Sequence, residues 1–229
     1  MGKCSEIRSR QLNDFVALNN SARQQLLEHS QAMVLKKGSL IFEEAQPLNK
    51  LYCIKKGACK FSKVDNDGHE RILRFLGEGE IMGKRSILSN QGAMVSAVAL
   101  TDIELCCLSK DHILQHLEQN VQFCRDFLNA LIEDANINER TRMIFCVHKG
   151  IQQRLVELLL YLSDKYGLDA QGRLRLRLKR EDMAAVLGTS QEYVINLLNR
   201  FKRKKLIAIV KSEVYIPSTK KLRAFSNKT

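Results

Sequence analysis

Residues 180–204, REDMAAVLGTSQEYVINLLNRFKRK, carry the side chains whose types and spacing best fit a chemical task. A helix beginning near residue 190 would expose five side chains that could enter a groove of nucleic acid: Gln191, Glu192, Ile195, Asn196 and Asn199. Thr189 or Ser190 would cap this helix, because a hydroxyl oxygen can accept a hydrogen bond from a backbone N–H of the first turn. The segment therefore indicates a helix that presents hydrogen-bonding groups to a partner.

The same segment has the small and apolar residues that a helix-turn-helix motif needs. Ala184 fits a place where two helices cross closely, and Gly188 can adopt the positive φ of a sharp turn. Four apolar residues are expected to form a small shared core: Met183, Leu187, Val194 and Leu197. Two short strands, residues 206–210 and 213–216, would follow as a wing. The pattern predicts a winged helix-turn-helix that binds DNA.

The positive charge of the chain is concentrated in its last third. Residues 150–229 contain 17 Lys and Arg against 7 Asp and Glu, whereas residues 1–149 contain 20 against 18. Such an asymmetry indicates a polyanionic partner, and the helical pattern favours nucleic acid over anionic lipid. Arg173, Arg175 and Arg177 alternate with leucines in this segment. These arginines form either the solvated face of a strand or a row along phosphates.

Other residues that could do chemistry form weaker patterns. His112 and His116, four residues apart, could ligate a metal or haem, although a solvated pair is the simpler interpretation. The seven cysteines include no CxxC pair and are expected to be reduced, buried thiols. No nucleophile–base pair, glycine-rich phosphate loop or acidic pair stands out. We therefore predict neither an enzyme nor a metal site.

The N-terminal half alternates in hydrophobicity and is punctuated by glycines. Strands are expected at residues 34–42, 51–55, 58–64, 71–76, 95–100 and 103–108, with a hairpin turn at residues 66–68. A helical pattern over residues 5–29 precedes them. No apolar run could span a bilayer and no signal peptide is visible, which favours a cytoplasmic protein without membrane contact. The chain is expected to be α+β, and its first domain, residues 1–110, an antiparallel barrel or jelly roll.

A long helix is predicted over the second domain, residues 111–149, which contain neither proline nor glycine. A seam with spacings of three and four runs along it: Leu128, Leu131, Ala135, Asn138, Arg142 and Phe145. A symmetric homodimer would cover this seam, with Asn138 and Arg142 fixing the register; the alternative is that the seam packs on its own barrel. Residues 150–229, the third domain, begin with a helix over residues 151–166.

The order of these elements resembles the cyclic-AMP receptor protein/FNR (CRP/FNR) family of bacterial transcription regulators. The motifs IKKGACKF around Gly57, DNDGHERIL and LGEGEIMGKRSIL support the resemblance, which covers residues 10–220. It implies a cyclic-nucleotide-binding-like β-roll for an effector, a long dimerisation helix and a winged helix-turn-helix. It also implies a homodimer that binds double-stranded DNA at a pseudo-palindromic site and contacts RNA polymerase.

Two departures from the family concern the effector. The cyclic-AMP-binding members have a ribose-binding Glu directly after the glycine that matches Gly83, and a phosphate-binding Arg-Ser pair about a dozen residues later. Lys84 and Val95-Ser96 stand at those places, so cyclic AMP in the usual pose is not expected. A lone N-terminal Cys4 does not match the cysteine cluster that holds iron and sulfur in the FNR branch.

Three possibilities for the effector remain open, and the cofactor is unknown. Five residues could form a cationic pocket for an unidentified anion: Gly83, Lys84, Arg85, Ser96 and Arg140. Alternatively, the two histidines could bind a metal or haem. In the third possibility the pocket is degenerate, and activity depends on the amount of protein or on a thiol.

For the DNA face, the resemblance aligns Gln191, Glu192 and Asn196 with three base-reading positions. Glu192 could accept a hydrogen bond from cytosine N4, and Gln191 or Asn196 could pair with adenine. Alternatively, Glu192 would complete a capping box with Thr189. Phosphate contacts are expected from Arg180, Ser190 and Lys211. A different class of function also stays open: a small-molecule-binding module whose basic domain meets RNA or a protein.

Overall fold

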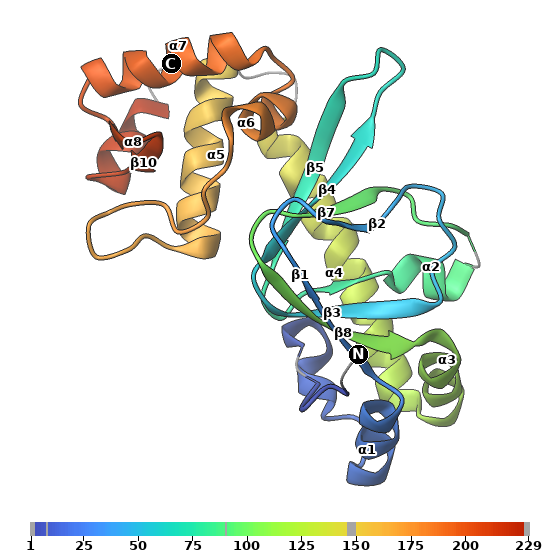
Figure 1. Ribbon diagram of the computed structural model, residues 1–229. Coiled ribbons are helices and arrows are strands. Elements are labelled where there is room, and N and C mark those ends of the chain that lie inside the picture. Colours follow the sequence, from blue (N-terminus) through green and yellow to red (C-terminus); the bar gives the residue numbers. More distant parts are fainter. Residues whose placement is uncertain (1–2, 8, 90, 146–149, 227–229) are drawn as a thin grey trace. The chain divides into compact units, whose positions relative to one another are not determined.

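The computed structural model describes residues 3–7, 9–89, 91–145 and 150–226 (Figure 1). Contacts group the chain into two units, Met1–Lys63 with Leu73–Asn138 and Val64–Ile72 with Glu139–Thr229. None of the helices in the described part of the chain is long and apolar enough to cross a membrane.

Two four-stranded sheets form the β-roll of the first unit (Figure 1). One sheet has the order β1-β8-β3-β6, with strands Gln31–Leu35, Ile103–Ser109, Lys50–Lys56 and Ile81–Met82. The other has the order β2-β7-β4-β5, with strands Leu40–Phe42, Ser96–Ala99, Ala58–Val64 and Glu70–Gly77. Antiparallel pairing joins β1 to β8, β8 to β3 and β4 to β7. The predicted antiparallel β-roll in an α+β chain is confirmed.

Glycine turns set the strand boundaries. Gly57 has φ +94° between β3 and β4, and an added Cβ there would lie 2.4 Å from the carbonyl oxygen of Asp102, so a larger residue does not fit. The strand expected over residues 34–42 is instead two strands, β1 and β2, which belong to different sheets. A turn in which Ser39 N donates to Lys36 O separates them.

The helices of the first unit are shorter than the sequence predicts. A 3-10 helix, η1 (Arg10–Phe15), and a capped α1 (Asn20–Glu28) replace the single helix expected over residues 5–29. After α2 (Lys84–Ser89), the predicted helix over residues 111–149 is broken into α3 (Lys110–Gln119) and α4 (Val121–Phe145). Asn120 causes the break, because its Oδ1 accepts from Phe123 N at 2.9 Å and its Nδ2 donates to Ala17 O at 2.9 Å.

The sheet that contains β8 is buried on both faces. Leu105 and Cys107 belong to the apolar core inside the roll. Cys106 and Leu108 face the opposite core, which η1, α1, α3 and α4 help to form. Neighbouring residues of a strand point to opposite faces, so both Cys106 and Cys107 are buried even though they belong to different cores.

Cys4 and Cys106 form a disulfide, with their Cα atoms 5.9 Å apart. The expectation that every cysteine is a free thiol is therefore wrong for this pair. Outside this disulfide, Cys53, Cys59 and Cys107 are buried thiols and Cys124 is a partly exposed thiol. Burial raises the pKa of Cys53 to about 12 and that of Cys107 to about 11. Cys146 lies outside the described residues.

The second unit contains a helical core and a small wing. Its helices are α5 (Ile151–Tyr166), α6 (Arg180–Leu187), α7 (Gln191–Arg203) and α8 (Thr219–Ser226), and its wing pairs β9 (Ala208–Val210) with β10 (Glu213–Tyr215). Leucines form the buried face of α5: Leu155, Leu158, Leu159 and Leu162. The sequence did not predict α8, whose Phe225 ring meets Phe201 edge-on, with centroids 5.7 Å apart.

Candidate nucleic-acid interface

The turn between α6 and α7 has the conformation expected from the sequence. Gly188 ends α6 with φ 62° and ψ 47°, a left-handed conformation that glycine adopts without strain. The backbone N–H groups of Gly188 and Thr189 both donate to Ala184 O. The four predicted core residues are buried, with exposed fractions of 5% or less: Met183, Leu187, Val194 and Leu197. Packing and backbone hydrogen bonds therefore fix how α7 is presented.

Ser190 caps the N-terminus of α7. Its Oγ accepts a hydrogen bond from Tyr193 N at 3.1 Å, which makes Tyr193 the third residue of the helix. Glu192 is therefore the second residue, and the alternative capping box between Thr189 and Glu192 is not formed. A carboxylate in the first turn still interacts favourably with the positive end of the helix dipole.

The three residues aligned with base-reading positions are exposed on α7. Gln191, Glu192 and Asn196 lie at spacings of one and four residues and so share a side of the helix, which Asn199 extends. Within the described chain, none of the four side chains makes a hydrogen bond or ion pair. Their hydrogen-bonding capacity is therefore available to another molecule.

The three expected phosphate contacts have different surroundings. Arg180 is partly buried, which lowers its pKa, and its Nη2 donates to Ser212 O at 3.0 Å. Lys211 and Ser212, with φ of 47° and 66°, form the turn between β9 and β10. Lys211 is exposed there and has no acidic partner in the described part of the chain. Arg180 thus stabilises the wing turn and Ser190 caps α7, whereas the side chain of Lys211 makes no hydrogen bond or ion pair with the described residues.

The row of arginines before α6 supports the wing. Arg173 binds both Asp169 (Nε–Oδ2 2.7 Å) and Glu213 (Nη1–Oε2 2.9 Å), and Arg177 also pairs with Glu213. These bonds, first the one from Arg173, lower the pKa of Glu213. The leucines between the arginines are buried as the alternation predicts, but only isolated bridges form, not a strand. Two of the three arginines are thus occupied by carboxylates.

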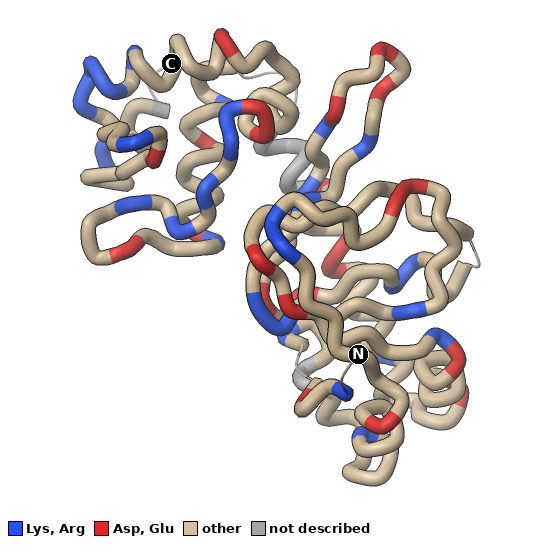
Figure 2. The backbone as a smooth tube through the Cα atoms, viewed as in Figure 1, with Lys and Arg blue, Asp and Glu red and all other residues tan. Residues whose placement is uncertain are grey.

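A basic run at the end of α7 is a further candidate for DNA contact (Figure 2). Arg200, Lys202 and Arg203 lie in its last turn, and Lys204 and Lys205 follow; all five are exposed. The described residues provide no acidic partner for any of them, although Lys204 Nζ lies 4.6 Å from the centre of the Phe225 ring. The sequence analysis did not single these residues out, although the run RFKRKK is visible in it.

Comparisons with known proteins agree with this geometry. A model of the cyclic nucleotide-binding domain matches residues 32–120, and a model of the Crp-like helix-turn-helix domain matches residues 153–225. The transcriptional regulatory protein btr of Bordetella pertussis is 30% identical over 183 residues, which cover 79% of this chain and 74% of that protein. The chain belongs to the CRP/FNR family of transcription regulators. The prediction of a DNA-binding regulator rather than an enzyme is confirmed.

Two further relatives extend the comparison. The CRP-like cAMP-activated global transcriptional regulator of Mycobacterium tuberculosis is 23% identical over 210 residues, which cover 91% of this chain and 93% of that protein. The solved structure of FixK2 from Bradyrhizobium japonicum has a TM-score of 0.75, with 19% identity and coverage of 85% and 96%. The latter likeness concerns the fold.

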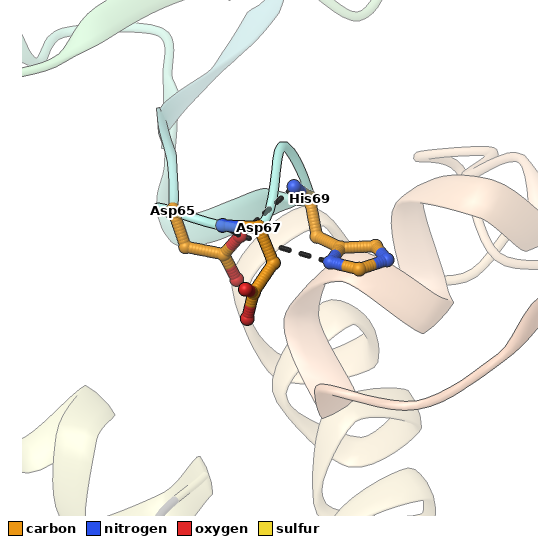
Figure 3. Close-up of side chains that lie close together, drawn as sticks. All are labelled: Asp65, Asp67 and His69. Carbon is orange, nitrogen blue, oxygen red and sulfur yellow. Dashed lines mark hydrogen bonds and ion pairs between the residues drawn. The ribbon is translucent and has the colours of Figure 1, made fainter.

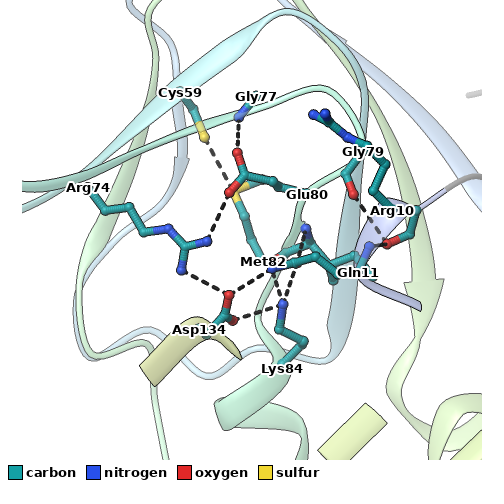
Figure 4. Close-up of polar contacts among 12 residues, drawn as sticks. Arg10, Gln11, Cys59, Arg74, Gly77, Gly79, Glu80, Met82, Lys84 and Asp134 are labelled. Carbon is teal, nitrogen blue, oxygen red and sulfur yellow. Dashed lines mark hydrogen bonds and ion pairs between the residues drawn. The ribbon is translucent and has the colours of Figure 1, made fainter. Parts of the chain in front are cut away.

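Lys84, which directly follows Gly83 in the β-roll, is part of a buried ionic cluster (Figure 4). The Lys84 side chain is 2% exposed, and its Nζ lies 2.8 Å from Asp134 Oδ2 of α4. Arg74, 3% exposed, donates to Asp134 Oδ1 and to Glu80 Oε1, both at 2.9 Å. Gln11 of η1 joins the cluster by donating to Asp134 Oδ1 and accepting from Lys84 Nζ. Two cations and two carboxylates thus neutralise one another.

The pKa values show how this cluster is balanced. Burial, with a smaller effect of the Arg74 charge, lowers the pKa of Lys84 below its ordinary value, although the nearby Asp134 raises it. Burial raises the pKa of Asp134, but Lys84 and Arg74 more than offset this, so that its pKa falls below the ordinary value. Asp134 is more exposed than Lys84 and has two cationic partners. These two differences explain why the protein favours the charged form of the Asp134 carboxylate but not that of the Lys84 ammonium.

The other expected pocket residues do not join this cluster. Arg85 is exposed, and its Nη1 lies 3.5 Å from Met94 Sδ. Ser96 Oγ accepts from Glu44 N at 3.0 Å, and Gly83 forms a turn with φ +91°. The side chain of Arg140 lies outside the described residues. Lys84 and Arg85 therefore differ in environment, and the structure does not present them as one cationic surface.

The predicted dimer seam on α4 is divided between an exposed and a buried part. Leu128 is 48% exposed and Ala135 is exposed, but Leu131 packs against the core of its own unit. Asn138 is partly buried, and the side chain of Arg142 lies outside the described residues. Ile132, which is not part of the predicted seam, is 59% exposed and lies one turn after Leu128.

The two histidines of α3 are not a solvated pair. His116 is 5% exposed, and burial, with a smaller effect of His112, lowers its pKa. The ring of His112 stacks on His29 with centroids 4.0 Å apart. The simpler interpretation of a solvated pair is therefore wrong, because α1 covers this part of α3.

Asp65, Asp67 and His69, in the turn between β4 and β5, offer ligand atoms within 4.8 Å of one another (Figure 3). The Asp65 carboxylate is already engaged: Oδ1 accepts from the backbone N–H of Asp67 and His69, and Oδ2 accepts from Arg71 Nε. Gly68 N also donates to Asp65 O at 3.0 Å, which closes the predicted hairpin turn. These hydrogen bonds of the turn account for the closeness of Asp65, Asp67 and His69.

Proposed function

We propose that this CRP/FNR regulator reads a specific DNA sequence as a homodimer through Gln191, Glu192 and Asn196. The observation that carries the proposal is an exposed polar face whose side chains make no hydrogen bond or ion pair with the described residues, on a helix that is capped and packed on its other side. Glu192 would accept from a cytosine N4, and the two amides would pair with adenines. Lys211, Ser190 and Arg180 would position the protein on phosphates.

The exposed apolar residues of α4 support the homodimer. Leu128, Ile132 and Ala135 lie at spacings of four and three residues, so a two-fold copy of α4 would cover them. In this proposal, Asn138 and Arg142 fix the register further along the same helix. A two-fold dimer places its recognition helices about 34 Å apart, one turn of DNA.

Selection of binding sites from random duplexes, followed by footprinting, tests the proposal. We expect a pseudo-palindrome with two protected half-sites about 10 base pairs apart. Leu128→Glu should give monomers that lose the paired footprint, whereas Asn129→Glu, an equal change at the neighbouring exposed position, should remain dimeric. If no duplex is enriched, the alternative module that binds RNA or a protein gains support.

The proposed function also includes an effector other than cyclic AMP and a contact with RNA polymerase. Lys84 is buried against Asp134 where a ribose ligand would be required, so we infer that cyclic AMP in the usual pose is not the effector. Calorimetry that showed stoichiometric binding of cyclic AMP would contradict this. Contact with RNA polymerase is proposed from the family alone, and transcription in vitro from a selected site would show whether the protein activates or represses.

A second candidate function, redox-gated regulation, is favoured by the Cys4–Cys106 disulfide. It links β8 to the N-terminal segment, whose Gln11 binds both Lys84 and Asp134. In thiol–disulfide exchange with glutathione disulfide, the two cysteine thiols would lose two electrons and two protons, and two glutathione molecules would be released. DNA affinity should then differ between protein equilibrated with oxidised and with reduced glutathione, and Cys4→Ser should abolish the difference. Equal affinities would exclude this gate.

A further inference from the structure

Two large apolar side chains are exposed on the recognition helix α7. Ile195 is 39% exposed and Tyr193 is 45% exposed. The remaining apolar residues of the helix are buried, with exposed fractions of 5% or less: Val194, Leu197, Leu198 and Phe201. Packing inside the protein therefore accounts for those four residues but leaves Ile195 without a full explanation.

The position of Ile195 distinguishes it from Tyr193. Gln191, Ile195 and Asn199 follow one another at spacings of four residues and so form a row along α7. Both amides of this row are exposed and make no hydrogen bond within the described chain. Tyr193 is two residues from Ile195 and so points away from this row. Ile195 is thus an apolar group between two groups that can pair with bases.

The major groove offers one apolar feature to such a side chain, the C5-methyl group of thymine. A branched aliphatic side chain cannot hydrogen-bond to a base edge. Its contact with a methyl group removes apolar surface of both from water, which favours binding. The surrounding unit carries the basic excess that brings it to DNA. We propose that Ile195 is a specificity-determining residue that reads a thymine in each half-site by contact with its 5-methyl group.

This inference rests on the proposed DNA-reading function and is tested by removing single methyl groups. Each thymine of the selected duplex is replaced in turn by deoxyuridine, which lacks only the C5-methyl group. Wild-type protein should lose affinity about fourfold at one thymine of a half-site and at its symmetry mate, the value for one buried methyl-sized group. The affinity of Ile195→Ala for the thymine duplex should be lower than that of the wild type by a factor of about four or more. Deoxyuridine at that position should cause no further loss of affinity in this variant.

Two variants serve as controls. Ile195→Val keeps a branched apolar side chain and should retain the sensitivity to deoxyuridine. Leu88→Ala removes an apolar side chain of similar exposure, 43%, from the other unit. It should leave the affinities for the thymine duplex and for the deoxyuridine duplex unchanged. Thermal melting of each variant shows that it is folded.

Either of two results would overturn the inference. The first is wild-type binding that no thymine-to-deoxyuridine change affects, and the second is a deoxyuridine effect that persists undiminished in Ile195→Ala. If a pseudo-palindrome is bound specifically but without this methyl effect, only the inference fails. If no sequence is enriched, the proposed function fails and the inference fails with it.

Discussion

The buried cluster of the β-roll and the exposed face of α7 use polar residues in opposite ways. In the cluster, Asp134 contacts Lys84, Arg74 and Gln11, and each charge lies beside an opposite charge inside the protein. On α7, Gln191 and Glu192 are held in place by the backbone while their side chains bind nothing within the described chain. The difference shows that a polar group can contribute to stability or to recognition, and that its partners indicate which.

The first prediction, with the largest expected effect, concerns the satisfied cluster. Asp134→Ala would leave Lys84 and Arg74 buried without their shared carboxylate, and we expect the free energy of unfolding to fall by about 3–5 kcal/mol. Glu133→Ala, at the exposed neighbouring position, should change it by less than about 0.5 kcal/mol. Urea unfolding measures both. A loss below about 1 kcal/mol for Asp134→Ala would show that the cluster is not a desolvated network.

The pH dependence of stability should identify the same carboxylate. The pKa of Asp134 is lowered in the folded chain, so its contribution is present above the ordinary pKa of an aspartate and is lost as the pH falls through the lower, folded value. Wild-type protein should therefore exceed Asp134→Asn in stability at neutral pH, and the gap should narrow in acid. A gap that is constant from pH 7 to pH 3 would contradict the assignment.

Substitution of Glu192, on the exposed face of α7, should affect DNA binding more than stability, in contrast to substitution of Asp134. Glu192→Ala should cost about 1–3 kcal/mol in binding to the selected site, with little effect on random DNA, because it removes a base contact. Its effect on the free energy of unfolding should stay below about 1 kcal/mol, the size of a helix-dipole interaction. Binding titrations and melting curves separate the two. Equal weakening on both DNAs would mean that Glu192 does not read a base.

The smallest effect is expected at the wing. Lys211→Ala should weaken binding to selected and random DNA alike and reduce the slope of log K against log salt by about 1.8, about 0.9 for each of the two phosphate contacts that a homodimer would lose. Arg180→Ala offers the comparison, because Arg180 also holds Ser212 of the wing turn. If Arg180 serves mainly the wing, its substitution should increase hydrogen exchange in β9 and β10, whereas Lys211→Ala should not.

The sequence predicted the helix-turn-helix well because its determinants are local. Gly188 lies four residues after Ala184, and the core residues follow helical spacing within a short segment. The β-roll was likewise visible from alternation and glycines. Asn120 also gave a local signal, since Asn is a common N-cap, but a search for proline and glycine alone overlooked it.

Pairings between distant residues were not predictable in this way. Gln11 and Asp134 are 123 positions apart, and Cys4 and Cys106 are 102 apart. Neither a hydrogen bond nor a disulfide across such a separation leaves a spacing pattern in one sequence. The same holds for the ion pairs of Glu213 with Arg173 and Arg177, which support the wing; the sequence alone left open whether the arginine row faces solvent or phosphates.

The contact between Lys84 and Asp134 can also be regarded as the binding of an intramolecular ligand, the Asp134 carboxylate, to Lys84. A carboxylate attached to α4 has an effective concentration set by the fold, and even short flexible tethers give millimolar values. A soluble anion that competes for Lys84 would have to exceed that concentration and would also leave Asp134 with only Arg74 and Gln11 as partners in the cluster. Ordinary changes in metabolite concentration should therefore leave this ion pair intact.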